Sequence, residues 1–214
     1  MRIVDLTHTI KEDMPVYPGT LPPSLKAAST VEKDGFKETL LSLFSHTGTH
    51  IDAPAHLFAK GCALDTLPAA QFAGKALVID CRDLGEGADV TMAHLAPYGD
   101  KVGKADFLLF CFGWDKKWGT PAYFESYPCL GEDVMAMILA GNYKGIGLDT
   151  ISLDPIADAA LPRHKMLLGA KEIINIENLS HLDECGSELF DFACLPLKYE
   201  NADGAPARAI AWVK

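Results

Sequence analysis

Three histidines and one aspartate lie within the eleven residues from His46 to His56, and this run constrains the chain more than any other segment. All four lie at even-numbered positions. Because alternate residues of a β-strand share one face, an extended chain directs His46, His50 and Asp52 to the same side. Like groups crowded on one face repel or compete unless a cation gathers them. We therefore expect a metal site here rather than a set of ordinary polar surface residues.

A helix is the alternative conformation for this run, because His46 and His50 have the four-residue spacing of helical zinc motifs. The neighbouring threonines are β-branched, Gly48 weakens a helix and Pro54 follows closely, so we favour a strand that runs into a loop. A proline cannot continue a strand ladder, so the chain should turn at Pro54 and present His56 from a different direction.

The candidate ligands form a mixed nitrogen and oxygen set, which zinc, manganese and iron(II) all accept. Three protein ligands, His46, His50 and Asp52, leave a coordination position for water. Metal binding lowers the pKa of water from about 15.7 to about 7, and the resulting hydroxide can attack the carbonyl of an amide or ester. His56 is the candidate proton carrier for the leaving group, because an unperturbed histidine has a pKa of about 6.5.

A second metal position is a weaker prediction from the sequence. His164 lies near the start of a predicted helix, and Glu177 follows a predicted strand. With Asp52 as a bridge, these two side chains would hold a second ion, as in enzymes that use two metals to activate water. The alternative for His164 is an ordinary residue at a helix end or on the surface.

Composition limits the class of protein and of partner. The 214 residues suit one domain, 1–214, with a full hydrophobic core. The net charge of −10 argues against a nucleic-acid partner, which would need a basic face. The six cysteines include no C-x-x-C pair, which indicates a reducing compartment. We see no signal peptide and no run long enough to cross a membrane, so we expect a cytoplasmic protein that acts on a small molecule.

The apolar pattern mixes strands with a few helices, which indicates an α/β or α+β domain. Predicted strands are 36–45, 76–80, 107–112, 145–148, 173–176, 190–197 and 208–213. Predicted helices are 91–96, 132–140 and 161–168. An Asp-Gly step within 201–204 predicts an antiparallel hairpin between the last two strands.

Some aromatic and histidine residues have two interpretations. Tyr17, in the proline-rich stretch 14–23, is either a wall of a pocket or the anchor of a surface loop. Trp114 and Trp118 either line the pocket or fill the core. We expect structural roles for the remaining histidines, which are His8, His94 and His181.

The histidine-rich run matches the pattern H-x-G-T-H-x-D-x-P-x-H, and on it the chain closely resembles the cyclase-like metal-dependent hydrolase family, which includes bacterial kynurenine formamidases and isatin hydrolases. Similarity covers nearly the whole chain, including 15–19, 113–119, 148–155, 164–168, 176–179 and 195–198. The resemblance implies a single-domain swivelling β/β/α fold of the α/β class, with a mixed sheet and few helices. It also implies a homodimer or homotetramer with one or two divalent ions per subunit, zinc first and manganese as the alternative.

The resemblance also assigns roles to matching residues. His56 corresponds to the proton donor and acceptor. Tyr17 stands where formamidases typically carry a tryptophan that stacks on the substrate, and tyrosine keeps a flat face for that contact. The first metal is assigned to His46, His50 and Asp52, and the second to Asp52, His164 and Glu177. Because the interval from His164 to Glu177 is one residue longer than we expect for formamidases, Glu172 is a rival for the last carboxylate.

The resemblance therefore implies an arylformamidase that hydrolyses N-formyl-L-kynurenine in tryptophan catabolism. One alternative is a cyclic-amide hydrolase similar to isatin hydrolase, or another acyl hydrolase. An alternative of another class is a non-catalytic metal-binding or ligand-binding module. His56 argues against that module, because a pure binding protein needs no proton shuttle beside its metal.

Overall fold

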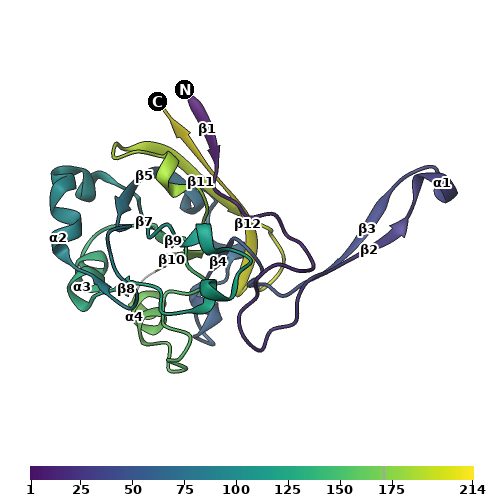
Figure 1. The fold of residues 1–214 in the computed structure, drawn as a ribbon, viewed down its shortest axis with the longest axis horizontal. Coiled ribbons are helices and arrows are strands. Elements are labelled where there is room, and N and C mark those ends of the chain that lie inside the picture. Colours follow the sequence, from purple (N-terminus) through teal and green to yellow (C-terminus); the bar gives the residue numbers. More distant parts are fainter. Residues whose placement is uncertain (171) are drawn as a thin grey trace.

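The computed structural model describes residues 1–170 and 172–214, and its main element is a mixed sheet of eight strands within those residues (Figure 1). The strand order is β1 (Arg2–Asp5), β12 (Gly204–Val213), β11 (Phe190–Pro196), β5 (Ala73–Asp80), β7 (Phe107–Cys111), β9 (Gly145–Leu148), β10 (Ile174–Glu177) and β4 (His50–Asp52). Because β4 also pairs with β12, the sheet closes into a barrel-like ring and β1 extends it.

One run of neighbouring strands in the ring is parallel, and the remaining strands run antiparallel to their neighbours. β5, β7, β9 and β10 form the parallel part. β4 runs antiparallel to both β10 and β12, and β11 runs antiparallel to β5 and β12. The predicted hairpin of the last two strands is confirmed. The mixed sheet and the α/β class expected from the resemblance are confirmed as well.

Helices and short strand pairs surround this sheet. The α-helices are α1 (Val31–Asp34), α2 (Met92–Leu95), α3 (Glu132–Ala140) and α4 (Pro162–Ala170). The 3-10 helices are η1 (Pro54–His56), η2 (Leu64–Thr66), η3 (Ala69–Phe72), η4 (Ala96–Lys104), η5 (Trp114–Lys117), η6 (Pro121–Phe124) and η7 (Leu182–Glu184). The remaining strands are β2 (Ser24–Ser29), β3 (Glu38–Ser42), β6 (Asp89–Val90) and β8 (Cys129–Leu130). No helix in the described part of the chain is long and apolar enough to cross a bilayer.

The two hydrophobic cores lie on opposite faces of the sheet. Strand β7 is buried along its whole length, and its side chains alternate between the cores, as the two-residue period of a strand requires. Phe107 and Leu109 belong to the core that also contains Ile51 of β4. Leu108 and Phe110 belong to the core that contains the buried residues of α3. A continuous apolar run is therefore the correct sequence signal for this strand.

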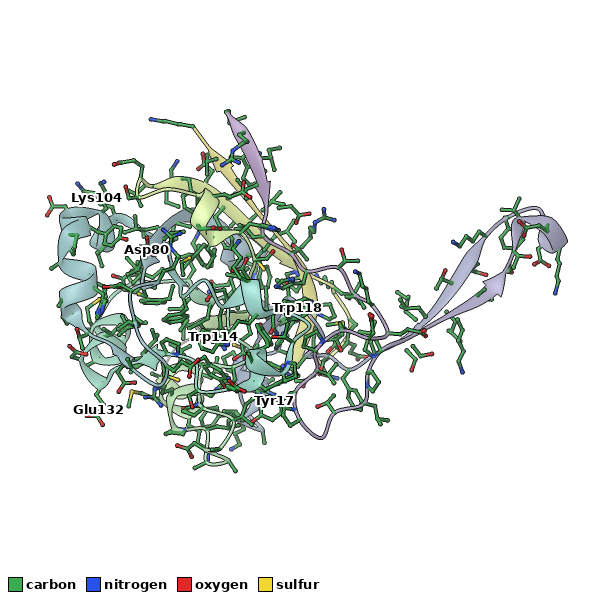
Figure 2. The ribbon with its side chains drawn as sticks, viewed as in Figure 1. Tyr17, Asp80, Lys104, Trp114, Trp118 and Glu132 are labelled. Carbon is green, nitrogen blue, oxygen red and sulfur yellow. The ribbon has the colours of Figure 1, made fainter. Side chains whose placement is uncertain are left out.

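A two-stranded arm extends from the body (Figure 1). β2 and β3 pair only with each other in the described structure, and α1 joins them at the tip. The predicted strand 36–45 was too long, because β3 ends at Ser42 and does not run into the histidine-rich segment. The side chains of the arm have no elements of the body around them (Figure 2).

Candidate metal centre

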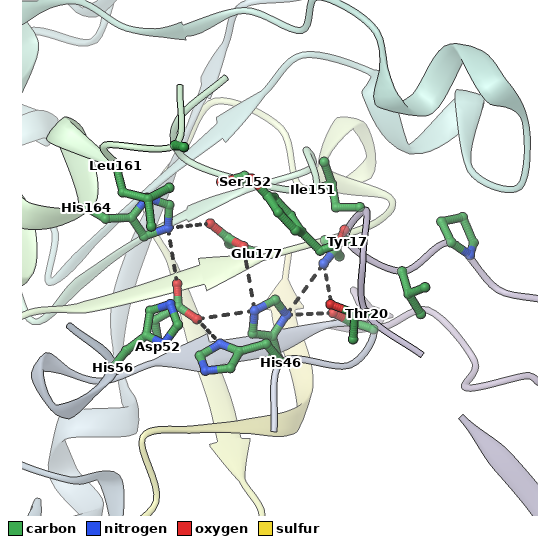
Figure 3. A pocket seen from close by; sticks show the side chains of 16 residues that line it. Tyr17, Thr20, His46, Asp52, His56, Ile151, Ser152, Leu161, His164 and Glu177 are labelled. Atoms are coloured by element: carbon green, nitrogen blue, oxygen red, sulfur yellow. Dashed lines mark hydrogen bonds and ion pairs between the residues drawn. The ribbon is translucent and has the colours of Figure 1, made fainter. Parts of the chain in front are cut away.

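A cavity of about 390 Å³ opens beside β4, and the candidate metal ligands line it (Figure 3). His50 and Asp52 come from β4 itself. In the antiparallel register, Glu177 of β10 lies opposite His50, and Asn175 lies opposite Asp52. Residues directly opposite each other in such a pair share one face of the sheet. The pairing of β4 with β10 therefore joins two parts of the cluster that lie far apart in the sequence.

His46 reaches the same cluster by a different route from the one predicted. The expectation of one extended strand through His46, His50 and Asp52 is wrong, because β4 begins only at His50. His46 lies in a turn, and Gly48 has a φ of 65°, a left-handed conformation that ends any extended run. The turn folds the His46 ring back, so that its Nδ1 lies 2.7 Å from Asp52 Oδ1.

The side chains of Asp52, His164 and Glu177 form a second group, and all three residues are buried. His164 Nε2 lies 3.0 Å from Glu177 Oε1 and 3.5 Å from Asp52 Oδ2. Asn175 donates from Nδ2 to both carboxylates, at 2.9 Å to Asp52 and 2.8 Å to Glu177. His164 is held in place by Asp154, whose carboxylate lies 2.7 Å from Nδ1.

The geometry favours Glu177 over its rival. Glu172 is exposed and contributes only its backbone carbonyl, which accepts a hydrogen bond from Gln71. Glu177 is 5% exposed and lies among the candidate ligands. Although the interval from His164 to Glu177 is one residue longer than expected, Glu177 still lies beside Asp52 and His164.

The carboxylates of this cluster stabilise positive charge on the histidines beside them. Burial opposes protonation of His164, but hydrogen bonds to Asp154, Asp52 and Glu177 outweigh it and raise its pKa to about 12. Burial also opposes protonation of His46, and its bonds to Asp203 and Asp52 raise its pKa to about 10. Despite complete burial, contacts with the histidines hold the pKa of Asp52 well below its usual range.

A divalent ion can also supply positive charge beside these carboxylates. The sets His46, His50, Asp52 and Asp52, His164, Glu177 each offer ligand atoms within 4.8 Å of one another. Nitrogen and carboxylate oxygen donors of this kind suit zinc and manganese. The residues present therefore fit one or two divalent ions, with Asp52 common to both sets.

His56 enters the site as the sequence predicted. Pro54 begins the 3-10 helix η1, and this helix carries His56 to the edge of the cavity. The His56 ring lies 4.0 Å from the His46 ring, centroid to centroid, and 6.4 Å from the His164 ring. Burial lowers the pKa of His56, which favours the neutral imidazole that can accept a proton.

Several polar residues that hold the candidate ligands have no role predicted from the sequence. Asp154 and Asn175 contact the second group, as described above, and Asn178 donates to the Gly48 carbonyl. Asp203 Oδ2 lies 3.0 Å from His46 Nε2. The sequence predicts only a hairpin turn for the segment that contains Asp203, and no local pattern marks an aspartate that contacts a histidine far away in the chain.

The aromatic residues take separate roles. Tyr17 lies in the cavity wall with Pro15 and Val16, so the pocket interpretation of this loop is confirmed geometrically (Figure 3). Trp114 is buried in the core and donates from Nε1 to the Tyr123 carbonyl. Trp118 stacks on His8 with ring centroids 3.9 Å apart, and neither tryptophan is among the described residues that line this cavity.

The fold and this cluster together define a barrel-like α/β protein with a buried centre of histidines and carboxylates. The chain belongs to the Cyclase family, since the family model described as "Putative cyclase" matches residues 4–155. This result confirms the family resemblance inferred from the histidine-rich run.

Relatives and solved structures agree with this membership. Cyclase-like protein 2 of Oryza sativa subsp. japonica is 27% identical over 220 residues, which cover 98% of this chain and 78% of that protein. Isatin hydrolase A from Labrenzia aggregata, bound to benzyl benzoate, is similar in structure, with a TM-score of 0.88, 28% identity, and coverage of 99% of this chain and 93% of that chain. A structure described as a potential metal-dependent hydrolase with cyclase activity has a TM-score of 0.74 and 28% identity, covering 98% of this chain and 96% of that chain.

We predict that His8 makes stability depend on pH. Burial lowers its pKa from 6.5 to about 4, opposed by Asp115 and reinforced by His181 and Lys116. As pH falls, the His8 ring is protonated in the unfolded chain before it is protonated in the folded protein. The free energy of unfolding should therefore fall as pH drops from 6.5 towards 4. Urea unfolding of the wild type and His8→Gln across this range checks the prediction. An equal loss of stability in both proteins would contradict it.

Proposed function

We propose that this chain is a metal-dependent hydrolase that cleaves an amide carbon–nitrogen bond of a small aromatic molecule. The observation that carries the proposal is a group of five candidate ligands, of which Asp52 is one. These residues line a cavity large enough for such a substrate. The similarity to isatin hydrolase A and to a potential metal-dependent hydrolase supports it.

In this proposal the chain binds one or two ions, zinc first and manganese as the alternative. One ion is held by His46, His50 and Asp52, and the other by Asp52, His164 and Glu177. A bound divalent ion supplies a Lewis acid for the carbonyl oxygen and lowers the pKa of water.

The remaining chemistry is assigned to groups of the chain itself. His56 lines the cavity, and burial lowers its pKa, which favours the form of the ring that can accept a proton from the attacking water. The protonated ring then gives that proton to the departing nitrogen, which leaves as an amine. Tyr17, with Pro15 and Val16, provides a wall against which a planar substrate can lie.

For the substrate we propose N-formyl-L-kynurenine, which makes the protein an arylformamidase of tryptophan catabolism in the cytoplasm. Hydrolysis of isatin or another cyclic amide is the second candidate, favoured by the similarity to isatin hydrolase A. Turnover of the two compounds, measured side by side on the same metal-loaded protein, separates them. Stoichiometric metal without turnover of any amide or ester would instead support a binding module.

Metal removal should abolish the activity. We expect chelation to eliminate formamidase turnover and added zinc or manganese to restore it. Asp52→Asn should lower the metal content measured by elemental analysis, because Asp52 belongs to both candidate sets. Asp191→Asn, which changes an exposed aspartate of β11, is the matched control and should keep both metal and activity. Full activity after complete metal removal would refute a metal-dependent mechanism.

Loss of the His56 side chain should affect the rate and leave metal binding intact. We expect His56→Ala to lower kcat about 10²- to 10⁴-fold, the usual contribution of a general acid or base. Metal content, measured on the same sample, should stay at the wild-type value. His94→Ala is the control, since His94 caps α2 outside the cavity. An unchanged kcat in His56→Ala would assign the proton transfer to another group.

We also propose that the chain forms a homo-oligomer through the arm. An isolated two-stranded hairpin is marginally stable, yet Leu40 and Leu41 of β3 are 61% and 58% exposed. Leu40→Glu combined with Leu41→Glu should shift the protein from oligomer to monomer in sedimentation velocity. Met166→Glu, at an exposed position of α4, should not. A wild-type protein that is monomeric at micromolar concentration would contradict the proposal.

A further inference from the structure

The turn before β12 is fixed against the strand that carries the candidate ligands. Gly204, the first residue of β12, lies opposite Asp52 in the antiparallel register. The preceding residue, Asp203, accepts a hydrogen bond from Ala53 N to its carbonyl oxygen at 2.9 Å. The backbone at 203 and 204 therefore has a defined position relative to β4.

The side chain of Asp203 contacts the ring of His46. Its Oδ2 lies 3.0 Å from His46 Nε2, while the other ring nitrogen, Nδ1, lies 2.7 Å from Asp52 Oδ1. Ser45 and Tyr199 bond the Asp203 carboxylate, each at 3.2 Å. Each nitrogen of His46 thus faces one carboxylate. A histidine that binds metal through one nitrogen almost always gives its other N–H to an acceptor, which fixes the orientation of the ring.

The His46 ring packs directly against the backbone of Gly204. A Cβ atom at position 204 would lie 2.8 Å from His46 Nε2 and 2.9 Å from Nδ1, closer than real contacts allow. Any residue other than glycine would therefore push the imidazole out of its place. This steric observation is independent of the hydrogen bond from Asp203.

One other role for Asp203 has to be weighed. His46, His56 and Asp203 also offer ligand atoms within 4.8 Å of one another, so the carboxylate could itself bind an ion. Two observations favour an orienting role. The Asp203 side chain is 42% exposed, whereas the side chain of Asp52 is 2% exposed. His56 Nδ1 lies 4.0 Å from Asp203, beyond hydrogen-bond distance, so of these two histidines His46 is the one that is bonded to the carboxylate.

We propose that Asp203 and Gly204 are positioning residues that orient the His46 imidazole for metal binding. Asp203 holds Nε2, which leaves Nδ1 directed at the metal set, and Gly204 gives the ring the space to lie there. This inference rests on the proposed role of His46 as a ligand. It does not depend on which substrate the protein hydrolyses.

The test is zinc affinity, measured by competition with a chromogenic chelator at fixed pH. We expect Asp203→Ala to weaken zinc binding about 10- to 100-fold, the usual effect of losing such a partner. Asp203→Asn keeps an acceptor oxygen and should lose less. Gly204→Ala should also weaken binding, although it changes no charge. Asp191→Asn, an exposed aspartate of β11, is the control for the loss of one negative charge and should bind like the wild type.

Stoichiometry and thermal unfolding separate the outcomes. Weaker affinity with the wild-type number of ions at saturation, and an unchanged melting temperature in the metal-free state, supports positioning. Wild-type affinity in Asp203→Ala overturns it, and loss of a whole ion overturns it in favour of a direct ligand. If Asp203→Ala does not fold, the same criteria apply to Asp203→Asn. A wild-type protein that binds no zinc or manganese refutes the metal site itself, which is a distinguishable result.

Discussion

The candidate site depends on the two-sided pairing of β4, a strand of only three residues. On one side β10 places Glu177 opposite His50. On the other side β12 places Gly204 opposite Asp52, which also brings Asp203 to the turn that carries His46. Closure of the sheet and assembly of the cluster are thus the same event. A shift of one residue in either register would turn the ligands to the opposite face.

The cluster concentrates charge where a folded protein normally avoids it. Asp52 and Glu177 are 1% and 5% exposed, and His50 and His164 are buried beside them. Burying ionised groups is costly unless partners compensate, and here the partners are amides, backbone N–H groups and imidazoles. The raised pKa values of His46 and His164 show that these carboxylates attract protons when nothing else supplies positive charge. A divalent cation can supply the same compensation through the nitrogen and oxygen atoms of these side chains.

Parts of the site could be predicted because their signal is local. The residues at 46, 50, 52 and 56 lie within one short run, and Pro54 correctly indicated the turn that separates His56 from the strand. Other parts have no local signal. Glu172 and Glu177 flank the same apolar run, but in the folded chain Glu172 is exposed, while the β10 register places Glu177 opposite His50.

The sequence by itself determined the family, the mixed α/β character and the chemical identity of the candidate ligands, because these depend on residue type and short-range spacing. Only the tertiary structure decided how His46 reaches the cluster, since a left-handed Gly48 replaced the expected strand. It alone revealed Asp203, which lies 157 residues from His46 in the chain and 3.0 Å from it in space. Such contacts arise from closure of the sheet, a long-range pairing that no short stretch of sequence encodes.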